Sequence, residues 1–212
     1  MLLVKGSKFT EKKKDGDFEY MLTLSEHEHT LFLFNENYLD SRLTIPKKGA
    51  GSACLRPFTL KFVSGDAKPR AHGILTGWSI CGGFSNLGLF EKSAIDESFT
   101  LCYKLLFKYK YSRIVFSCSN DNEKALGTGL FNVDKEVLDY INFKLNYELP
   151  RIFCTNANPG LRLNSLLSSD RKRELFEYAQ LWHNYRKLEM ELAELKKKAK
   201  KKRKAEASLV VE

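Results

Sequence analysis

Two runs of small residues have the composition of loops that bind phosphate groups. The first is Gly127-Thr128-Gly129-Leu130-Phe131, and the second is Gly49-Ala50-Gly51-Ser52-Ala53. Glycine lets a ligand approach the backbone closely, and backbone N–H groups at the start of a helix attract anions. Two such runs predict a diphosphate that is held from both sides. The alternative is that the glycines only allow the chain to turn tightly.

Each glycine run follows an apolar segment that is typical of a buried β-strand. Thr30–Phe34 precedes the Gly49 run, and Arg113–Cys118 precedes the Gly127 run. Asp134 is suited to cap a helix that follows the second run. The apolar face of that helix comprises Val137, Leu138, Ile141 and Leu145. Strand, glycine loop and helix in this order point free backbone N–H groups at an anion.

Several other chemistries find no support in the motifs. No G-x-x-x-x-G-K-[ST] occurs, which disfavours a P-loop ATPase. Asn132 stands where a dinucleotide-binding motif has its third glycine, which disfavours a Rossmann dehydrogenase. No G-x-S-x-G motif or local cysteine-protease signature occurs either. His27 and His29 alternate on a predicted strand without a third zinc ligand, so we expect a solvated strand edge and no metal site.

The remaining segments complete a pattern of alternating strands and helices. Phe18–Leu24 and Ile74–Ile80 are further predicted strands, and Ala94–Cys102 begins a predicted helix. This order predicts an α/β fold, a three-layer α/β/α sandwich with a mixed central sheet. We expect it to occupy residues 1–155, which is ample for a sizeable core.

Composition and cysteine usage indicate the compartment. The chain has 212 residues, of which 43% are hydrophobic, and no apolar run approaches the length of a membrane span. The first residues are too short to form the core of a signal peptide. The five cysteines include no C-x-x-C pair, which argues for a reducing compartment and against a disulfide framework. We therefore expect a cytoplasmic or nuclear protein that does not bind a membrane.

The positive charge of the chain is concentrated near its C-terminus. Eight of the nine residues Lys196–Lys204 are basic, and without them the net charge of +9 falls to +1. Such a block repels itself, so residues 196–212 are predicted to be a disordered or frayed tail. A basic tail binds polyanions such as nucleic acid or serves as a nuclear localisation signal. The alternative is a tail that only increases solubility.

A long helix is predicted between the domain and the tail. Residues 156–195 form this extension, and Asn156–Gly160 marks its boundary because Pro-Gly favours a turn. From Asp170 to about Lys198 there is no Pro or Gly. Apolar residues recur at spacings of three and four: Tyr178, Leu181, Tyr185, Leu188, Leu192 and Leu195. Phe176, Ala179 and Trp182 widen this face, so we expect the first half to pack on the domain. Residues 181–195 have the narrow stripe of a partner-binding helix.

These motifs together resemble macrodomains, the modules that bind ADP-ribose. Leu33-Phe34-Asn35-Glu36-Asn37, followed by the Gly49 run, is similar to the family's strand, asparagine-rich motif and glycine loop. Arg113–Cys118, followed by the Gly127 run, is similar to its later strand and second phosphate loop. The resemblance covers roughly residues 18–149 and implies binding of ADP-ribose or a related nucleotide diphosphate, with no cofactor.

The resemblance also implies roles for individual residues. The two glycine runs would donate backbone N–H groups to the phosphates, Asn35 or Asn37 would hydrogen-bond the distal ribose, and Phe131 would lie against it. If the ligand is hydrolysed, the implied catalytic residues are Asn37 and Asp121. The alternative for both asparagines is that they cap the turn after the strand. A different class of function stays open, a nucleic-acid-associated or scaffold protein that acts through its tail and C-terminal helix.

Overall fold

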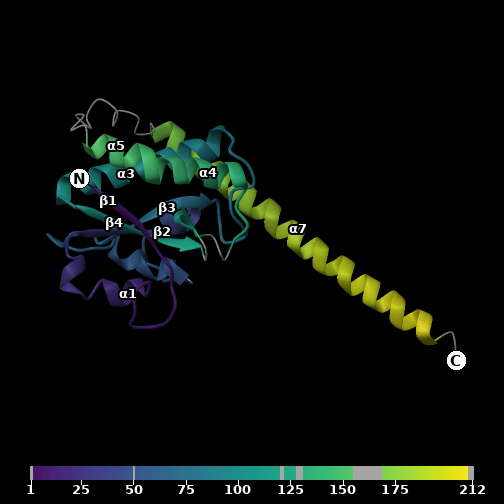
Figure 1. Cartoon of the computed structure of the whole chain (residues 1–212). Helices are drawn as coiled ribbons and strands as arrows, with labels where there is room; N and C mark the ends of the chain where they lie inside the picture. Colours follow the sequence, from purple (N-terminus) through teal and green to yellow (C-terminus); the bar gives the residue numbers. More distant parts are fainter. Residues whose placement is uncertain (1, 50, 120–121, 128–130, 155–168, 210–212) are drawn as a thin grey trace.

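Four parallel strands form the centre of the sheet in a computed structural model that describes residues 2–49, 51–119, 122–127, 131–154 and 169–209. Their order across the sheet is β1 (Leu3–Ser7), β4 (Arg113–Ser119), β2 (Thr30–Asn37) and β3 (Ala71–Gly77). β5 (Asn122–Leu126) pairs with β4 in the antiparallel direction. A mostly parallel sheet with helices confirms the predicted α/β class (Figure 1).

The central strand β2 buries both of its faces, which explains its continuous apolar sequence. Leu31 and Leu33 belong to the larger apolar cluster, on one face of the sheet. Phe32 and Phe34 belong to a separate cluster on the opposite face. All four side chains are fully buried. Because successive side chains of a strand point to opposite faces of the sheet, β2 contributes to both apolar clusters.

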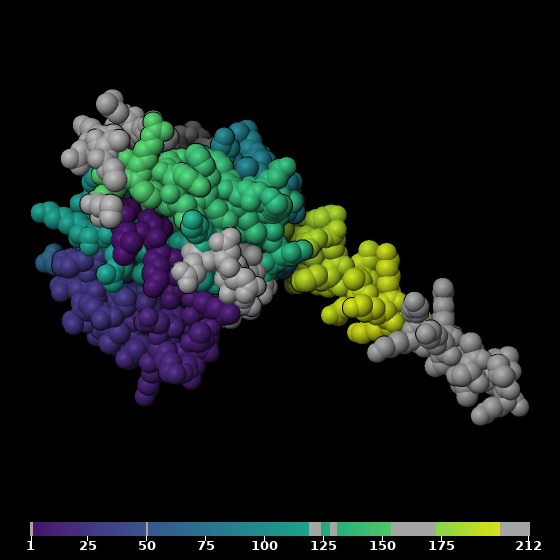
Figure 2. Space-filling model, viewed as in Figure 1, coloured from purple at the N-terminus to yellow at the C-terminus, as the bar shows by residue number. Residues whose placement is uncertain are grey.

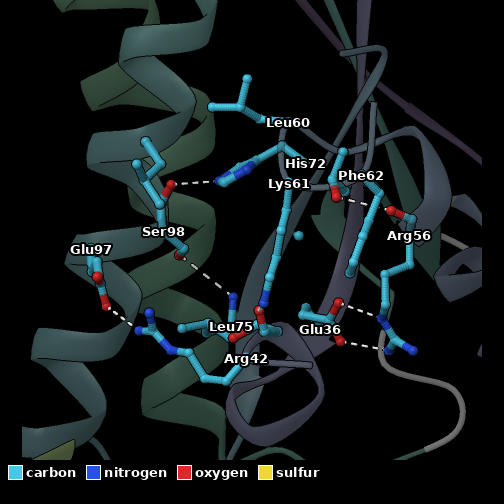
Figure 3. A pocket seen from close by; sticks show the side chains of 14 residues that line it. Glu36, Arg42, Arg56, Leu60, Lys61, Phe62, His72, Leu75, Glu97 and Ser98 are labelled. Carbon is cyan, nitrogen blue, oxygen red and sulfur yellow. Dashed lines mark hydrogen bonds and ion pairs between the residues drawn. The ribbon is translucent and has the colours of Figure 1, made fainter. Parts of the chain in front are cut away.

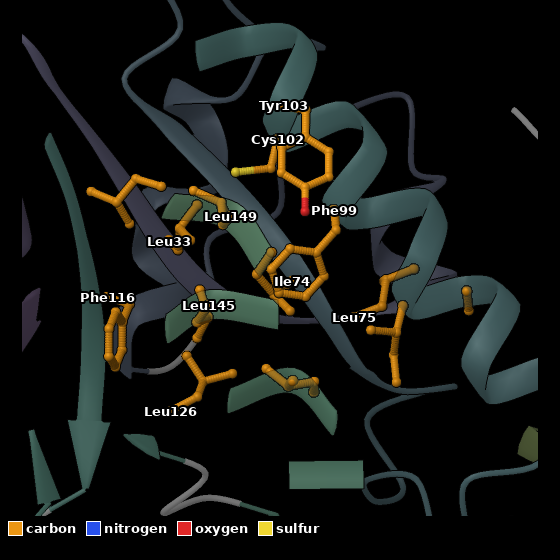
Figure 4. Close-up of a cluster of buried hydrophobic side chains, with 14 of the residues drawn as sticks. Leu33, Ile74, Leu75, Phe99, Cys102, Tyr103, Phe116, Leu126, Leu145 and Leu149 are labelled. Atoms are coloured by element: carbon orange, nitrogen blue, oxygen red, sulfur yellow. The ribbon is translucent and has the colours of Figure 1, made fainter. Parts of the chain in front are cut away.

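Helices from the second half of the domain cover the larger cluster. They are α3 (Leu89–Tyr109), α4 (Lys135–Phe143), the π-helical segment η3 (Lys144–Glu148) and α5 (Leu149–Cys154). Phe99 from α3 and Leu145 from η3 lie over Leu33 and Phe116 of the sheet (Figure 4). The side chain of Asp134 accepts from the backbone N of Glu136, so the predicted cap of α4 is confirmed. Helix α3 begins before the predicted Ala94, at Leu89.

Short helices cover the smaller cluster: α1 (Phe18–Met21), η1 (Ser25–His27) and the 3-10 helix η2 (Gly51–Phe58). The predicted strand over Phe18–Leu24 is therefore wrong. Asp17 caps α1 by accepting from the N–H of Tyr20, and Phe18 and Met21 then share one buried side. The ring of Phe18 lies 5.2 Å from that of Phe32. Phe18 and Met21 are three residues apart, as on one face of a helix, and not two apart, as on one face of a strand.

The predicted strand edge with His27 and His29 is also wrong. His27 ends η1, and its ring is buried with its centre 5.6 Å from the ring of Phe32. Within the described ranges, no three His, Cys, Asp or Glu side chains are grouped as metal ligands. None of the helices found there is long and apolar enough to cross a bilayer.

The long helix α7 (Ser169–Leu209) docks on the domain at one end and projects from it at the other (Figures 1 and 2). Leu175 and Ala179 are buried, and Tyr178 stacks on Phe90 with ring centres 4.7 Å apart. Docking of the first half is thus confirmed, although Phe176 is exposed. The stripe beyond it is exposed, from Leu181 (69%) to Leu195 (61%). The helix continues past the predicted end at Lys198, through the basic block.

Candidate functional site

A small cavity of about 180 Å³ lies where the parallel strands β2 and β3 end. The chain leaves β2 towards β3, whereas it leaves β4 in the opposite direction, towards β5 beside β1. In open α/β sheets, ligands bind where the connections diverge in this way, outside the carboxyl ends of the strands. The connections diverge between the neighbouring strands β2 and β4, and the end of β2 lines this cavity, so we take it as the candidate site.

Four of the predicted site residues line this one cavity: Asn35, Asn37, Gly49 and Phe131. Gly51 and Ser52 are the first residues of η2, directly before the lining residue Ala53. Gly127 is joined to the site by a hydrogen bond from Asn35. The other predicted residues lie outside the described ranges: Asp121, Thr128, Gly129 and Leu130.

Asn35 presents an unused hydrogen-bond acceptor. Its Nδ2 donates to the carbonyl oxygen of Gly127, which fixes the orientation of the amide because that oxygen only accepts. Its Oδ1 is buried and has no partner among the described residues. A buried acceptor without a donor costs about 1–3 kcal/mol. Asn35 lines the cavity, and a ligand hydroxyl or N–H group that reached this oxygen would remove that cost.

Asn37 has a structural role at the start of α2 (Tyr38–Ser41). Its Oδ1 accepts from the backbone N of Asp40 at 2.8 Å, and its Nδ2 donates to the carboxylate of Asp40 at 2.9 Å. This is the capping arrangement that asparagine favours before a helix. Both polar ends of the side chain are used, so Asn37 holds Asp40 at the cavity wall.

A buried ion pair between Glu36 of β2 and Arg56 of η2 lines the cavity. The Arg56 guanidinium donates to both carboxylate oxygens of Glu36, at 2.7 and 2.6 Å, and to Asp40 at 3.2 Å. The side chains of Arg56 and Glu36 are both 4% exposed. Burial raises the pKa of Glu36, while the hydrogen bonds from Arg56 oppose that shift. Arg56 therefore neither faces solvent nor has its charge free for a phosphate.

The lining groups taken together favour a neutral, hydrogen-bond-donating ligand group at this end. Two carboxylates, Glu36 and Asp40, share the single guanidinium of Arg56, which leaves one net negative charge. Asn35 adds a neutral acceptor beside them. Hydroxyl groups can donate to such acceptors, whereas a phosphate placed beside a surplus carboxylate is repelled.

The backbone donors at the two glycine runs are partly engaged within the protein. The N–H of Gly49 donates to the carbonyl of Ala53 at 3.3 Å, and that of Gly127 donates to Ser117 at 2.8 Å. The first N–H groups of any 3-10 helix have no partner inside the helix. Gly51 and Ser52 begin η2, so their N–H groups are the candidate donors of the first run.

Glycines of the β3–α3 connection also shape the cavity, and the sequence motifs did not assign them a role. A Cβ on Gly77 would lie 2.6 Å from the carbonyl oxygen of Gly82, and one on Gly83 would lie 2.5 Å from Val133. These close approaches bring the end of β3 against Gly82, and bring the connection at Gly83 against the segment before α4. The recurrence of glycine just after the predicted strand Ile74–Ile80 was the available signal.

Searches with this chain against protein-family models, curated proteins and solved structures return no match.

Proposed function

We propose that this chain binds ADP-ribose or a related nucleotide diphosphate, in the manner of the macrodomains that its motifs resemble. In this proposal the apolar clusters on both faces of the sheet correspond to a three-layer α/β/α sandwich. The observation that carries the proposal is the buried, unpartnered Oδ1 of Asn35, a residue that lines a cavity at the carboxyl end of the sheet.

The distal ribose is the part of the ligand assigned to the cavity. Its hydroxyls would donate to Oδ1 of Asn35 and to the carboxylate of Asp40, which are acceptors. Whole small-molecule ligands occupy pockets of about 300–1,000 Å³, so a cavity of about 180 Å³ suits one moiety of the ligand. Phe131 supplies an apolar surface for the sugar ring.

The phosphates are assigned to the surface beside the cavity, along the start of η2 and the Gly127 run. Gly51 and Ser52 supply N–H groups at the start of a helix, which attract anions. The proposal concerns binding alone. Hydrolysis would need a further group, because Asn37 is committed to capping α2 and Asp121 lies outside the described ranges.

Calorimetric titration with ADP-ribose and ADP tests this assignment. ADP lacks the distal ribose, so we expect it to bind at least about tenfold more weakly, the effect of roughly one lost hydrogen bond to a buried acceptor. Asn35→Ala should weaken ADP-ribose by a similar factor and leave ADP unchanged. Asn146→Ala is the matched control, since Asn146 also donates its Nδ2 to a backbone carbonyl, that of Lys124.

Two outcomes would contradict the proposal. One is the absence of saturable heat with ADP-ribose for the folded wild-type protein. The other is an Asn35→Ala variant that keeps full affinity for ADP-ribose, because the ribose would then lie elsewhere. Since Asn35 also contacts the loop at Gly127, the affinity for ADP reports whether that loop has been disturbed.

The projecting half of α7 favours a second function, the binding of a polyanion such as nucleic acid. Lys196–Lys198 are exposed on a helix that leads away from the domain, and they begin the basic block Lys196–Lys204 (Figure 2). Deleting residues 196–212 should abolish most nucleic-acid binding, and the affinity of the full chain should fall steeply with salt. ADP-ribose binding should be unaffected by the deletion. Nucleic-acid binding that survives with its salt dependence intact would locate the basic surface elsewhere.

A further inference from the structure

A larger cavity, of about 330 Å³, lies between α3, β3 and the segment that follows η2 (Figure 3). Glu36 and Arg56 line both this cavity and the candidate site. The remaining lining residues of the two cavities differ, so the larger one forms a separate compartment. Its volume falls within the range of about 300–1,000 Å³ that is typical of small-molecule sites.

Much of the wall of this cavity is apolar. Leu60 and Phe62 come from the segment after η2, Leu75 from β3 and Leu101 from α3. Leu60 is 48% exposed and Leu101 is 36% exposed. Large apolar side chains that converge on a hollow and keep part of their surface in water favour an apolar ligand group.

The charged residues of the wall have a surplus of cations. Arg56 is paired with Glu36, and Nη2 of Arg42 is paired with Glu97 at 2.9 Å. Lys61 donates to the carbonyl oxygen of Ser41 at 3.1 Å and has no ion pair among the described residues. Two carboxylates therefore face three cations in this wall.

Arg42 and Lys61 also retain capacity to bind an anion. The Nε–H of Arg42 is buried and has no acceptor among the described residues. Burial, and secondly the charge of Arg42, lower the pKa of Lys61. Two cations that disfavour each other's charge are both stabilised when an anion binds between them.

The back wall adds no compensating charge. His72 is buried, and its Nε2 donates to the carbonyl oxygen of Ser98 at 2.7 Å. Burial lowers the pKa of His72 to about 4, so this ring is neutral at pH 7. The surplus positive charge therefore lies with Lys61, because Figure 3 shows the neighbouring Arg42 extending to its partner Glu97.

We propose that this cavity binds a small organic anion with an apolar body. The anionic head would lie between Arg42 and Lys61, and the apolar body would lie along Leu60, Phe62 and Leu101. This inference is independent of the proposed binding of ADP-ribose, because neither Asn35 nor the glycine runs contribute to this cavity.

Calorimetric titration with sodium octanoate and octan-1-ol, on the full chain, tests the proposal. The two probes share an apolar chain and differ in the charged head. We expect octanoate to bind saturably and octan-1-ol to bind about tenfold more weakly, since a charge-assisted hydrogen bond is worth about that factor. Lys61→Met should reduce octanoate affinity to the level of octan-1-ol, and Leu101→Asp should weaken both probes.

The matched control is Lys68→Met. Lys61 lies over the ring of Phe62, and Lys68 likewise lies over the ring of Tyr111. Lys68 also donates to a backbone carbonyl, that of Glu28 at 3.2 Å, but it does not line the cavity. Octanoate affinity should be unchanged in this variant. The proposal is overturned if octanoate shows no saturable binding at millimolar concentration, or if Lys61→Met and Lys68→Met behave alike. Saturating octanoate should leave the ADP-ribose titration unchanged, so the two proposals fail or succeed separately.

Discussion

Replacing Arg56 with methionine should strongly destabilise the protein. The substitution would leave the carboxylate of Glu36 without the two short hydrogen bonds, of 2.7 and 2.6 Å, that compensate its burial. Removing one partner of a buried ion pair costs about 3–5 kcal/mol. For a domain of this size, that corresponds to a fall of roughly 6–20 °C in the thermal midpoint. Urea unfolding followed by circular dichroism measures the change directly.

Two companion variants and the pH dependence separate burial of charge from loss of packing. In Arg56→Met, burial raises the pKa of Glu36 above its unfolded value, opposed only by the remaining hydrogen bond from the backbone N–H of Asn37. The folded state then binds the proton more tightly, so the variant should lose stability as pH rises above about 4.5. Glu36→Gln combined with Arg56→Met should recover part of the loss, because no charge remains buried. Arg186→Met, which breaks the exposed pair with Glu189, should cost less than about 1 kcal/mol. A cost below about 1 kcal/mol for Arg56→Met would refute the reasoning.

Three further predictions concern single residues. The pKa of His72, about 4, lies below the unfolded value of 6.5, so wild-type stability should fall by about 3 kcal/mol as pH falls from 6.5 to 4. Urea midpoints across that range should fall less in His72→Gln. Gly77→Ala should cost about 1–3 kcal/mol in urea unfolding, because its Cβ would lie 2.6 Å from the carbonyl of Gly82. Leu175→Ala should cost about 2–4 kcal/mol, and Leu181→Ala should stay within about 0.5 kcal/mol by the same measurement, because only Leu175 is buried.

The fold could be predicted where the signal was local. The apolar runs that become β2 and β4, and the cap at Asp134, involve neighbouring residues only. The prediction of a strand over Phe18–Leu24 was wrong because an apolar pair three residues apart fits both a short helix and an irregular strand. Its contact with Phe32 decided between them. The strand β5 was missed because Asn122–Leu126 is largely polar and pairs only with the end of β4.

The candidate site could be predicted only in part, for a similar reason. Asn35 and Gly49 were identified because each follows a strand signal, and they line one cavity. The pairing of Glu36 with Arg56, residues 20 apart, was not predictable. A carboxylate inside an apolar strand indicates a buried partner, but the chain has 35 basic residues and no local pattern selects one. Burial of both groups is set by the placement of η2 against β2 and β3.

The Glu36–Arg56 pair is the shared wall of two cavities for which we propose opposite ligand preferences. Its guanidinium is already used by Glu36 and Asp40, so each cavity takes its character from the groups that it does not share. On one side these are the acceptors Asn35 and Asp40, which suit hydroxyl donors. On the other side they are the cations of Arg42 and Lys61, which suit an anion. Substituting Arg56 would expose both cavities to an uncompensated carboxylate, so that variant reports stability and cannot assign a ligand. Asn35 and Lys61 each line one cavity, and their substitution can therefore assign the two ligands separately.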